Sequence, residues 1–296
     1  MGCLWFRRCF AFVAAAALLG NGCSAPAGHG AAGGPNGGVA ATGMDLLRTV
    51  RQRGRLVVSA DADYAPQSYK GADGVWRGFD VDVAREIARR LSLRAQFMDV
   101  NFDAITGGNW NGRWDVNVNS MTATHERERV LYFSRPYYYV PAAFVVHKLS
   151  QMQSINDLSG RRVGVGTATT YQEYLEGRLG LSGDRIVHAA PQARAVPYDT
   201  DQLALQDLAL GDGVRLDAAL TSGLFARYQI KHGQPLRLLG DPVFFEASAV
   251  AIDRHSALDA TSLYRAVDRA IADMHKDGTL RRLSVQYFGI DASHRQ

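Results

Sequence analysis

The sequence predicts an α/β protein with largely parallel sheets, on three observations. The chain has 296 residues, which suggests about two compact units, since domains commonly hold ~150 residues. Of these residues 47% are hydrophobic and 21% are charged, which is typical of a globular protein that buries its own core. From residue 44 onward, short apolar segments alternate with segments whose apolar residues recur at helical spacing. Strands separated in this way by helices are typical of α/β folds.

Three strands and two helices are expected in the first half of this region. Three short segments have the composition of strands: 55–59, 94–98 and 115–118. A helix is expected between the first two, because five apolar residues there share one helical face: Val81, Ala84, Ile87, Ala88 and Leu91. We expect Asp80 to be its N-cap, and a second helix to run through 125–129.

The second half repeats this alternation. Strands are expected at three places: 162–166, 185–187 and 216–220. Helices are expected at 171–178 and 201–210, and a long amphipathic helix from Asp259 whose stripe holds five residues: Leu263, Val267, Ala270, Ile271 and Met274. Ligands of α/β sheets bind at the carboxyl ends of strands, so we expect a site in the loops there: 60–69, 100–102, 119–127, 167–170 and 221–223.

The composition excludes several kinds of site. All three cysteines, Cys3, Cys9 and Cys23, lie in the first 23 residues, so the rest of the chain holds no disulfide, cysteine metal site or catalytic thiol. The eight histidines lack metal-ligand spacing, and no P-loop or nucleophile-elbow motif is present, so we expect no metal and no other cofactor. The net charge of +4 does not indicate a nucleic-acid partner.

The first 22 residues have the pattern of a secretory signal peptide. Arg7 and Arg8 precede an apolar segment, 9–19, which is shorter than the ~20 residues that cross a membrane. One interpretation is a plain signal peptide that is cleaved near 25–27.

The other interpretation is a lipoprotein signal, in which Cys23 is lipidated after cleavage. Residues 19–24 resemble a bacterial lipobox, although Gly20 stands where that pattern has leucine. Residues 23–43 are small, uncharged and rich in glycine and proline, so we expect a flexible tether with an r.m.s. reach of about 25 Å. This tether favours the lipoprotein, and we expect a periplasmic or extracytoplasmic protein anchored to the membrane through Cys23.

Nine short motifs stand in one register between about residues 45 and 290. Four lie in the first half: Asp61-x-x-Tyr64-Ala65-Pro66, Gly78-Phe79-Asp80-Val81-Asp82, Asn101-Phe102-Asp103 and Ser120-Met121-Thr122-x-Thr124-x-Glu126-Arg127. Five follow: Phe133-Ser134-x-Pro136-Tyr137, Asp157-Leu158-x-Gly160-x-x-Val163-Gly164-Val165, Thr169-Thr170, Asp217-Ala218 and Asp277-Gly278-Thr279-Leu280. In this order they resemble family 3 of the bacterial extracellular solute-binding proteins, the polar amino-acid receptors of ABC importers.

The resemblance implies the type II periplasmic-binding-protein fold, in which two α/β lobes with parallel sheets close on a solute. The first lobe would comprise 44–141 and 244–296, and the second 142–243. Two segments would form the hinge, near 139–142 and near 246–250.

The resemblance assigns the ligand's carboxylate to Arg127. A guanidinium meets a planar carboxylate with two parallel, charge-assisted hydrogen bonds. Ser120 and Thr122 would complete the polar lining, and Thr124 would cap the turn before Arg127. The alternative is that all three hydroxyl residues only cap this turn.

Five further positions carry family roles. Thr170 begins a helix whose free N–H groups would bind the carboxylate from the second lobe, or it is a plain N-cap. Tyr64 and Phe102 would sandwich the solute's side chain. Asp61 either meets a basic side chain or holds its own loop, and Gln67 replaces a frequent aromatic residue, which would make the pocket more polar.

Ser222 departs from the family pattern, which usually has an aspartate there to pair with the ligand's α-ammonium. A buried ammonium without an anion is unfavourable, and a hydroxyl carries no charge. Either the ligand lacks a standard α-ammonium, or another carboxylate supplies the charge, for which the sequence offers four: Asp61, Asp199, Asp201 and Glu246.

We therefore expect the substrate-binding component of an ABC importer, a monomer that delivers an amino acid or related carboxylate to an inner-membrane permease. One alternative is an enzyme similar to cyclohexadienyl dehydratase, which shares this scaffold. Ser222 is evidence against this enzyme, because a serine at position 222 leaves no obvious proton donor on the second-lobe wall. The other alternative is a ligand-sensing module that acts with a partner chain.

Overall fold

The computed structural model describes residues 45–183 and 185–295. The expected signal peptide, 1–22, and the expected tether, 23–43 with Cys23, lie outside these residues. Within the described part of the chain, none of the helices has the length and apolar character needed to cross a membrane.

The first of two five-stranded sheets has the strand order β5-β1-β6-β13-β7. Its strands are β1 (Arg55–Ala60), β5 (Arg94–Asp99), β6 (Val116–Asn117), β7 (Leu131–Phe133) and β13 (Ala251–Asp253). β1 runs parallel to β5 and β6, whereas β13 pairs antiparallel with β6 and β7. The apolar faces of four helices form the main core with this sheet: α1 (Leu46–Arg53), α2 (Phe79–Arg90), α7 (Thr261–Lys276) and α8 (Thr279–Phe288). We call this part lobe 1.

The second sheet has the order β10-β9-β11-β8-β12 and forms lobe 2. Its strands are β8 (Tyr138–His147), β9 (Arg162–Gly166), β10 (Arg194–Tyr198), β11 (Ala218–Ser222) and β12 (Leu236–Ser248). Cores form on it with three helices: α4 (Thr170–Leu175), α5 (Asp201–Ala209) and α6 (Gly223–Lys231). Shorter elements complete the chain: β2 (Asp63–Tyr64), β3 (Ser68–Lys70), β4 (Trp76–Arg77), α3 (Phe102–Thr106) and the 3₁₀ turns η1 (Arg127–Arg129) and η2 (Ile155–Leu158).

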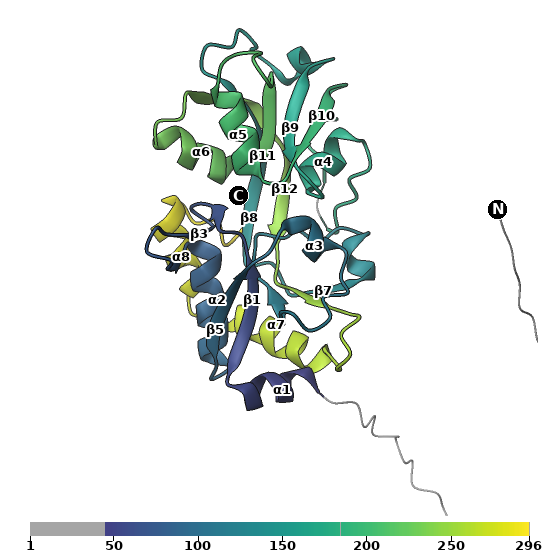
Figure 1. Cartoon of the computed structure of the whole chain (residues 1–296), viewed down its shortest axis with the longest axis vertical. Helices are drawn as coiled ribbons and strands as arrows, with labels where there is room; N and C mark the ends of the chain where they lie inside the picture. The colour runs from purple at the N-terminus through teal and green to yellow at the C-terminus, as the bar shows by residue number, and fades with distance from the viewer. Residues whose placement is uncertain (1–44, 184, 296) are drawn as a thin grey trace, which may run out of the picture. The chain divides into compact units, whose positions relative to one another are not determined.

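Two long antiparallel strands, β8 and β12, connect the lobes (Figure 1). Their pairing runs from Tyr138 opposite Ser248 to Ala142 opposite Phe244, and after a register shift it continues into lobe 2. Tyr138 packs in the core of lobe 1, while Ala142 and Phe244 pack in a core of lobe 2. The polypeptide therefore crosses between the lobes twice, in one hydrogen-bonded ribbon.

The predicted alternation of strands and helices is correct, but three local predictions are wrong. Asp80 is not the N-cap of α2: Gly78 is, and Asp80 lies buried inside the first turn. The first N–H groups of α2 are satisfied by backbone carbonyls, since Phe79 donates to Pro66 (3.0 Å) and Asp80 to Gln67 (2.8 Å). A side-chain cap is thus unnecessary there.

The other two errors lie where the strand pairing of the folded chain decides the element. The segment 125–129 forms only the η1 turn, because the chain enters β7 directly afterwards. The segment 185–187 is not a strand: β10 pairs with β9 instead, and Ile186 makes a single bridge to Phe244. The amphipathic helix predicted from Asp259 is confirmed as α7, whose five buried residues are those of the predicted stripe, and α8 follows after Gly278 in the left-handed region at φ 74°.

Gly78 generates a prediction about stability. Its backbone (φ 124°, ψ 171°) is a conformation essentially restricted to glycine, and a Cβ there would lie 2.3 Å from the carbonyl oxygen of Gln67. We expect Gly78→Ala to lower the free energy of unfolding by about 2–4 kcal/mol in urea denaturation. The control is Gly107→Ala, since Gly107 has φ −77° and open space around it. Equal stabilities of the two variants would contradict the prediction.

Candidate functional site

A cavity lies where the loops of the two lobes meet, with about 530 Å³ of space not filled by atoms, its open mouth included. Lobe 1 contributes one wall: Asp61, Tyr64, Phe102, Asn119, Ser120, Thr122 and Arg127. Lobe 2 contributes the other: Gly166, Thr167, Thr169, Thr170, Tyr171, Asp199, Thr200 and Asp201. Glu246 of β12 completes the lining.

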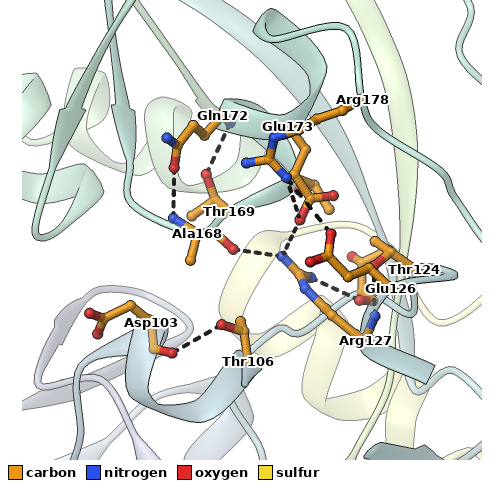
Figure 2. A network of polar contacts seen from close by, with 12 residues as sticks. Asp103, Thr106, Thr124, Glu126, Arg127, Ala168, Thr169, Gln172, Glu173 and Arg178 are labelled. Atoms are coloured by element: carbon orange, nitrogen blue, oxygen red, sulfur yellow. Dashed lines mark hydrogen bonds and ion pairs between the residues drawn. The ribbon is translucent and has the colours of Figure 1, made fainter. Parts of the chain in front are cut away.

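Arg127 is a buried guanidinium that spans the two lobes, with 3% of its surface exposed. Its Nη1 donates to the carbonyl of Thr122 (2.9 Å) and its Nη2 to the carbonyl of Ala168 in lobe 2 (2.8 Å). Glu173 of α4 lies 3.7 Å from Nη2, and Figure 2 shows Arg127 pointing toward both lobe 2 groups. Burial lowers the pKa of Arg127, and the negative charge of Glu173 opposes this shift.

The guanidinium keeps hydrogen-bonding capacity for a further anion. An arginine has five N–H donors, and the Nε of Arg127 is buried without a partner among the described residues. The ring of Phe102 lies 5.4 Å from the guanidinium carbon and shields it from one side. Buried unpaired donors are rare in proteins, so Arg127 is suited to receive an acceptor from the cavity.

Glu246 joins the two lobes from the connecting ribbon. Its Oε1 accepts hydrogen bonds from Thr122 of lobe 1 (3.1 Å) and from Thr170 of lobe 2, and its Oε2 accepts from Tyr171 (2.7 Å). Burial raises its pKa, while these three hydroxyls stabilise the ionised form. Thr122 and Thr170, both expected to face a ligand, thus line the cavity with their hydroxyls directed at Glu246.

Asp201 provides a second buried carboxylate, from the first turn of α5. Its Oδ1 accepts from the N–H of Gly166 (3.0 Å) and its Oδ2 from the hydroxyl of Thr221 (2.6 Å). Burial raises the pKa of Asp201 to about 7, and repulsion from Asp61 and Glu246 adds to the shift. Position 222 carries no acidic group, and Asp201, one of the four candidate carboxylates, lines the lobe 2 wall from another loop.

Asp61 contributes a third carboxylate from the loop after β1. Its Oδ1 accepts from the N–H of Asp63 (2.7 Å), so the loop-holding role is observed in the structure. Burial also raises the pKa of Asp61 to about 6, and repulsion from Asp99 and Asp63 contributes. The side chain lines the cavity at the same time, so both expected roles are compatible with its position.

The remaining expected residues of lobe 1 differ in how they face the cavity. Ser120 lines it at φ 50°, but its hydroxyl donates to Asp80 (2.6 Å). Thr124 caps the η1 turn by accepting from the N–H of Arg127 (3.3 Å) and does not line the cavity. Tyr64 lines it with its ring stacked on Phe225 of lobe 2, at 4.8 Å between centroids.

Ser222 and Gln67 lie outside the lining, contrary to expectation. The hydroxyl of Ser222 accepts from the N–H of Phe225 (3.3 Å) and so caps α6. Gln67 is buried and donates from Nε2 to the same hydroxyl (3.3 Å). Position 222 is therefore covered by a neighbouring side chain instead of facing the cavity.

Several lining residues were not singled out in the sequence, although most follow a strand in an expected loop. Gly166, Thr167 and Thr169 precede Thr170 in the loop after β9, and Tyr171 follows it. Thr200 lies in the loop after β10, which is not among the expected ligand loops because the preceding strand is predicted at 185–187. A correct placement of β10 would have pointed to this loop.

Comparison with known proteins places this arrangement in a family. The family model for bacterial extracellular solute-binding proteins, family 3, matches residues 56–290. The chain belongs to this family. The match includes both lobes and every residue that lines the cavity.

Two curated relatives illustrate the range of this family. The L-cystine-binding protein TcyJ of Escherichia coli K12 is 33% identical over 251 residues, which cover 84% of this chain and 88% of the relative. The histidine-binding periplasmic protein of Salmonella typhimurium is 28% identical, with coverage of 80% and 88%.

Solved structures show the same two-lobed fold. A mutant of ArgBP from T. maritima aligns with a TM-score of 0.71 at 27% identity, covering 82% of this chain and 99% of that one. The ancestral amino acid-binding protein AncCDT-1, described as a precursor of cyclohexadienyl dehydratase, aligns with a TM-score of 0.69 at 28% identity over 82% and 99%. The type II fold expected from the sequence is confirmed.

In this family member a short strip of contacts joins the lobes beside the cavity. His125 donates its N–H to the carbonyl of Gly180 (3.0 Å), and Ser182 donates its N–H to the carbonyl of Ala123 (3.2 Å). The hydroxyl of Ser182 donates to Glu128 across the same gap (2.7 Å). Because 123–128 belong to lobe 1 and 180–182 to lobe 2, separation of the lobes breaks these bonds.

The Ser182–Glu128 bond can be tested with a double-mutant cycle. We expect Ser182→Ala and Glu128→Ala each to lower the free energy of unfolding by about 1 kcal/mol, the usual net contribution of a hydrogen bond. Because both remove the same bond, the double variant is expected to be destabilised by about 1 kcal/mol less than the sum. Urea denaturation measures the free energies of unfolding of the wild type and the three variants. In small-angle X-ray scattering, the variants are expected to have a larger radius of gyration than the wild type. Additive effects would rule out this bond as a coupling between the lobes.

Proposed function

We propose that this protein is the extracytoplasmic receptor of an ABC importer and that it binds an amino acid or a related carboxylate. The observation that carries the proposal is the pairing of opposite charges in one cavity. Arg127 keeps an unpartnered Nε on the lobe 1 wall, and the carboxylates of Asp201 and Glu246 stand on the same cavity. A zwitterion has the complementary groups, a carboxylate for the guanidinium and an ammonium for a carboxylate.

Closure of the two lobes is the proposed mechanism of capture. A ligand that bonds to both walls favours the closed state, because the open state offers it only one wall. The β8–β12 ribbon is suited to act as the hinge, since it forms the connection between the two sheets. The proposed lobe boundaries are 44–141 with 244–296 for lobe 1 and 142–243 for lobe 2, and the packing of Val140 in the lobe 1 core and of Ala142 in a lobe 2 core supports the first crossing.

We further propose that the protein acts as a monomeric binding protein and not as an enzyme, with the ligand passed to a membrane permease. The curated relatives described above carry names of binding proteins, which supports this choice over the dehydratase alternative. The described residues hold no cluster of three or more histidine, cysteine or acidic side chains placed to bind a metal.

Removal of the Arg127 guanidinium tests the proposed site. We expect Arg127→Ala to weaken binding by at least about 30-fold in isothermal titration calorimetry, because loss of a buried charged partner costs about 2–5 kcal/mol. L-arginine, L-histidine and L-cystine are the probes, each titrated into the wild type and the variant. Arg129→Ala is the control, since Arg129 is exposed on the same turn and does not line the cavity. Unchanged affinity in Arg127→Ala would refute the site.

The lipid anchor is proposed on Cys23 and has its own test. In full-length protein expressed in a bacterial host, we expect the wild type in the membrane fraction, because a lipid chain buries its methylene groups in the bilayer. Cys23→Ser is expected to appear in the aqueous fraction, whereas Cys9→Ser, within the expected signal peptide, is expected to behave as the wild type. Membrane association of Cys23→Ser, or an acyl-free mass of the mature wild type, would exclude the anchor.

A further inference from the structure

The charges that face the cavity are out of balance. Four of the described lining residues carry a carboxylate: Asp61, Asp199, Asp201 and Glu246. One, Arg127, carries a positive charge, and a carboxylate outside the lining, Glu173, already lies 3.7 Å from it. A neutral zwitterion adds one charge of each sign and leaves this excess of negative charge unchanged. A ligand with a second cationic group reduces it.

Asp201 is the carboxylate best placed to bind that cationic group. Its two oxygens accept one hydrogen bond each, from neutral donors, and it forms no ion pair with any of the described residues. A carboxylate can accept about four hydrogen bonds, so each oxygen retains capacity. Glu246, by comparison, already accepts from three hydroxyls.

The surroundings of Asp201 hold it in one orientation. A Cβ at Gly166 would lie 2.6 Å from Oδ1, so the absence of a side chain at 166 allows the close approach. Thr221, whose hydroxyl donates to Oδ2, lies at the end of β11, next to the covered position 222. The Asp201 carboxylate is thus fixed from two sides before a ligand arrives, which lowers the entropic cost of binding.

We propose that Asp201 is the specificity-determining residue of this cavity and that it selects net-cationic amino acids over neutral ones of the same shape. The inference rests on the proposed function, because it requires an amino acid in this site. The carboxylate of the ligand would bind at Arg127, and the cationic group of its side chain would bind at Asp201. A ligand with two carboxylates, such as L-cystine, would find no second cationic side chain among the described lining residues.

Calorimetry with a matched pair of ligands tests the selection. L-arginine and L-citrulline have nearly the same shape, but only L-arginine carries the side-chain charge. We expect the wild type to bind L-arginine at least about 10-fold more tightly than L-citrulline, and Asp201→Asn to lose most of this difference. Asp207→Asn, on the same helix but outside the lining, is expected to retain the wild-type preference.

The pH dependence of the wild type gives a second measurement that does not depend on a variant. Four titratable groups interact electrostatically with Asp201, namely Asp61, Glu246, Tyr64 and Tyr171, and Asp199 and Arg127 line the same cavity. Burial raises the pKa of Asp201 to about 7, and a protonated carboxyl does not attract a cation. Affinity for L-arginine is therefore expected to fall below pH 7, more steeply than affinity for L-citrulline. In Asp201→Asn the remaining fall is expected near pH 6, where Asp61 titrates.

The possible outcomes separate this inference from the proposed function. If none of L-arginine, L-citrulline, L-histidine, L-glutamine and L-cystine binds, both fail. If L-citrulline or L-glutamine binds as tightly as L-arginine, or if L-cystine binds most tightly, the charge selection is wrong while the receptor function stands. If the preference for L-arginine persists in Asp201→Asn, the role of Asp201 is wrong.

Discussion

The architecture of the site depends on a cation that is buried where two lobes meet. A guanidinium away from water must be hydrogen-bonded, and the two Nη atoms of Arg127 meet this requirement with one carbonyl from each lobe, Thr122 and Ala168, while its Nε stays unpaired among the described residues. Glu173 of lobe 2 supplies a counter-charge. These contacts couple the position of α4 to the turn that carries Arg127, so the conformation of the lobes and the hydrogen bonding of the cation depend on each other.

The acidic groups complement this cation from the other sides of the cavity. Glu246 lies on the connecting ribbon and accepts hydrogen bonds from hydroxyl groups of both lobes. Separation of the lobes would therefore change the hydrogen bonding of Glu246. Asp201 and Asp61 have pKa values raised by burial, to about 7 and about 6, so their ionised forms are held at a cost that a cationic partner would relieve. In the proposed complex, a cationic ligand would offset this unfavourable burial of negative charge.

Much of the fold could be predicted from local patterns alone. Periodic apolar residues and the β-favouring composition of 55–59 and 162–166 identified strands and helices, because these signals act over a few residues. The wrong predictions lie in segments whose structure depends on contacts between residues far apart in the sequence. Asp80 has the chemistry of an N-cap, yet backbone carbonyls from another loop cap α2 and leave Asp80 to bind Ser120 and Tyr137.

The sequence by itself determined the family, the loops that hold the cavity and the place of Arg127, because these follow from order and spacing along the chain. Only the tertiary structure decided how the charges are arranged. Asp61, Asp201 and Glu246 are far apart in the chain, and strand order together with the β8–β12 ribbon brings them to one cavity. The same packing covers Ser222, and the carboxylates that line the cavity come from other loops.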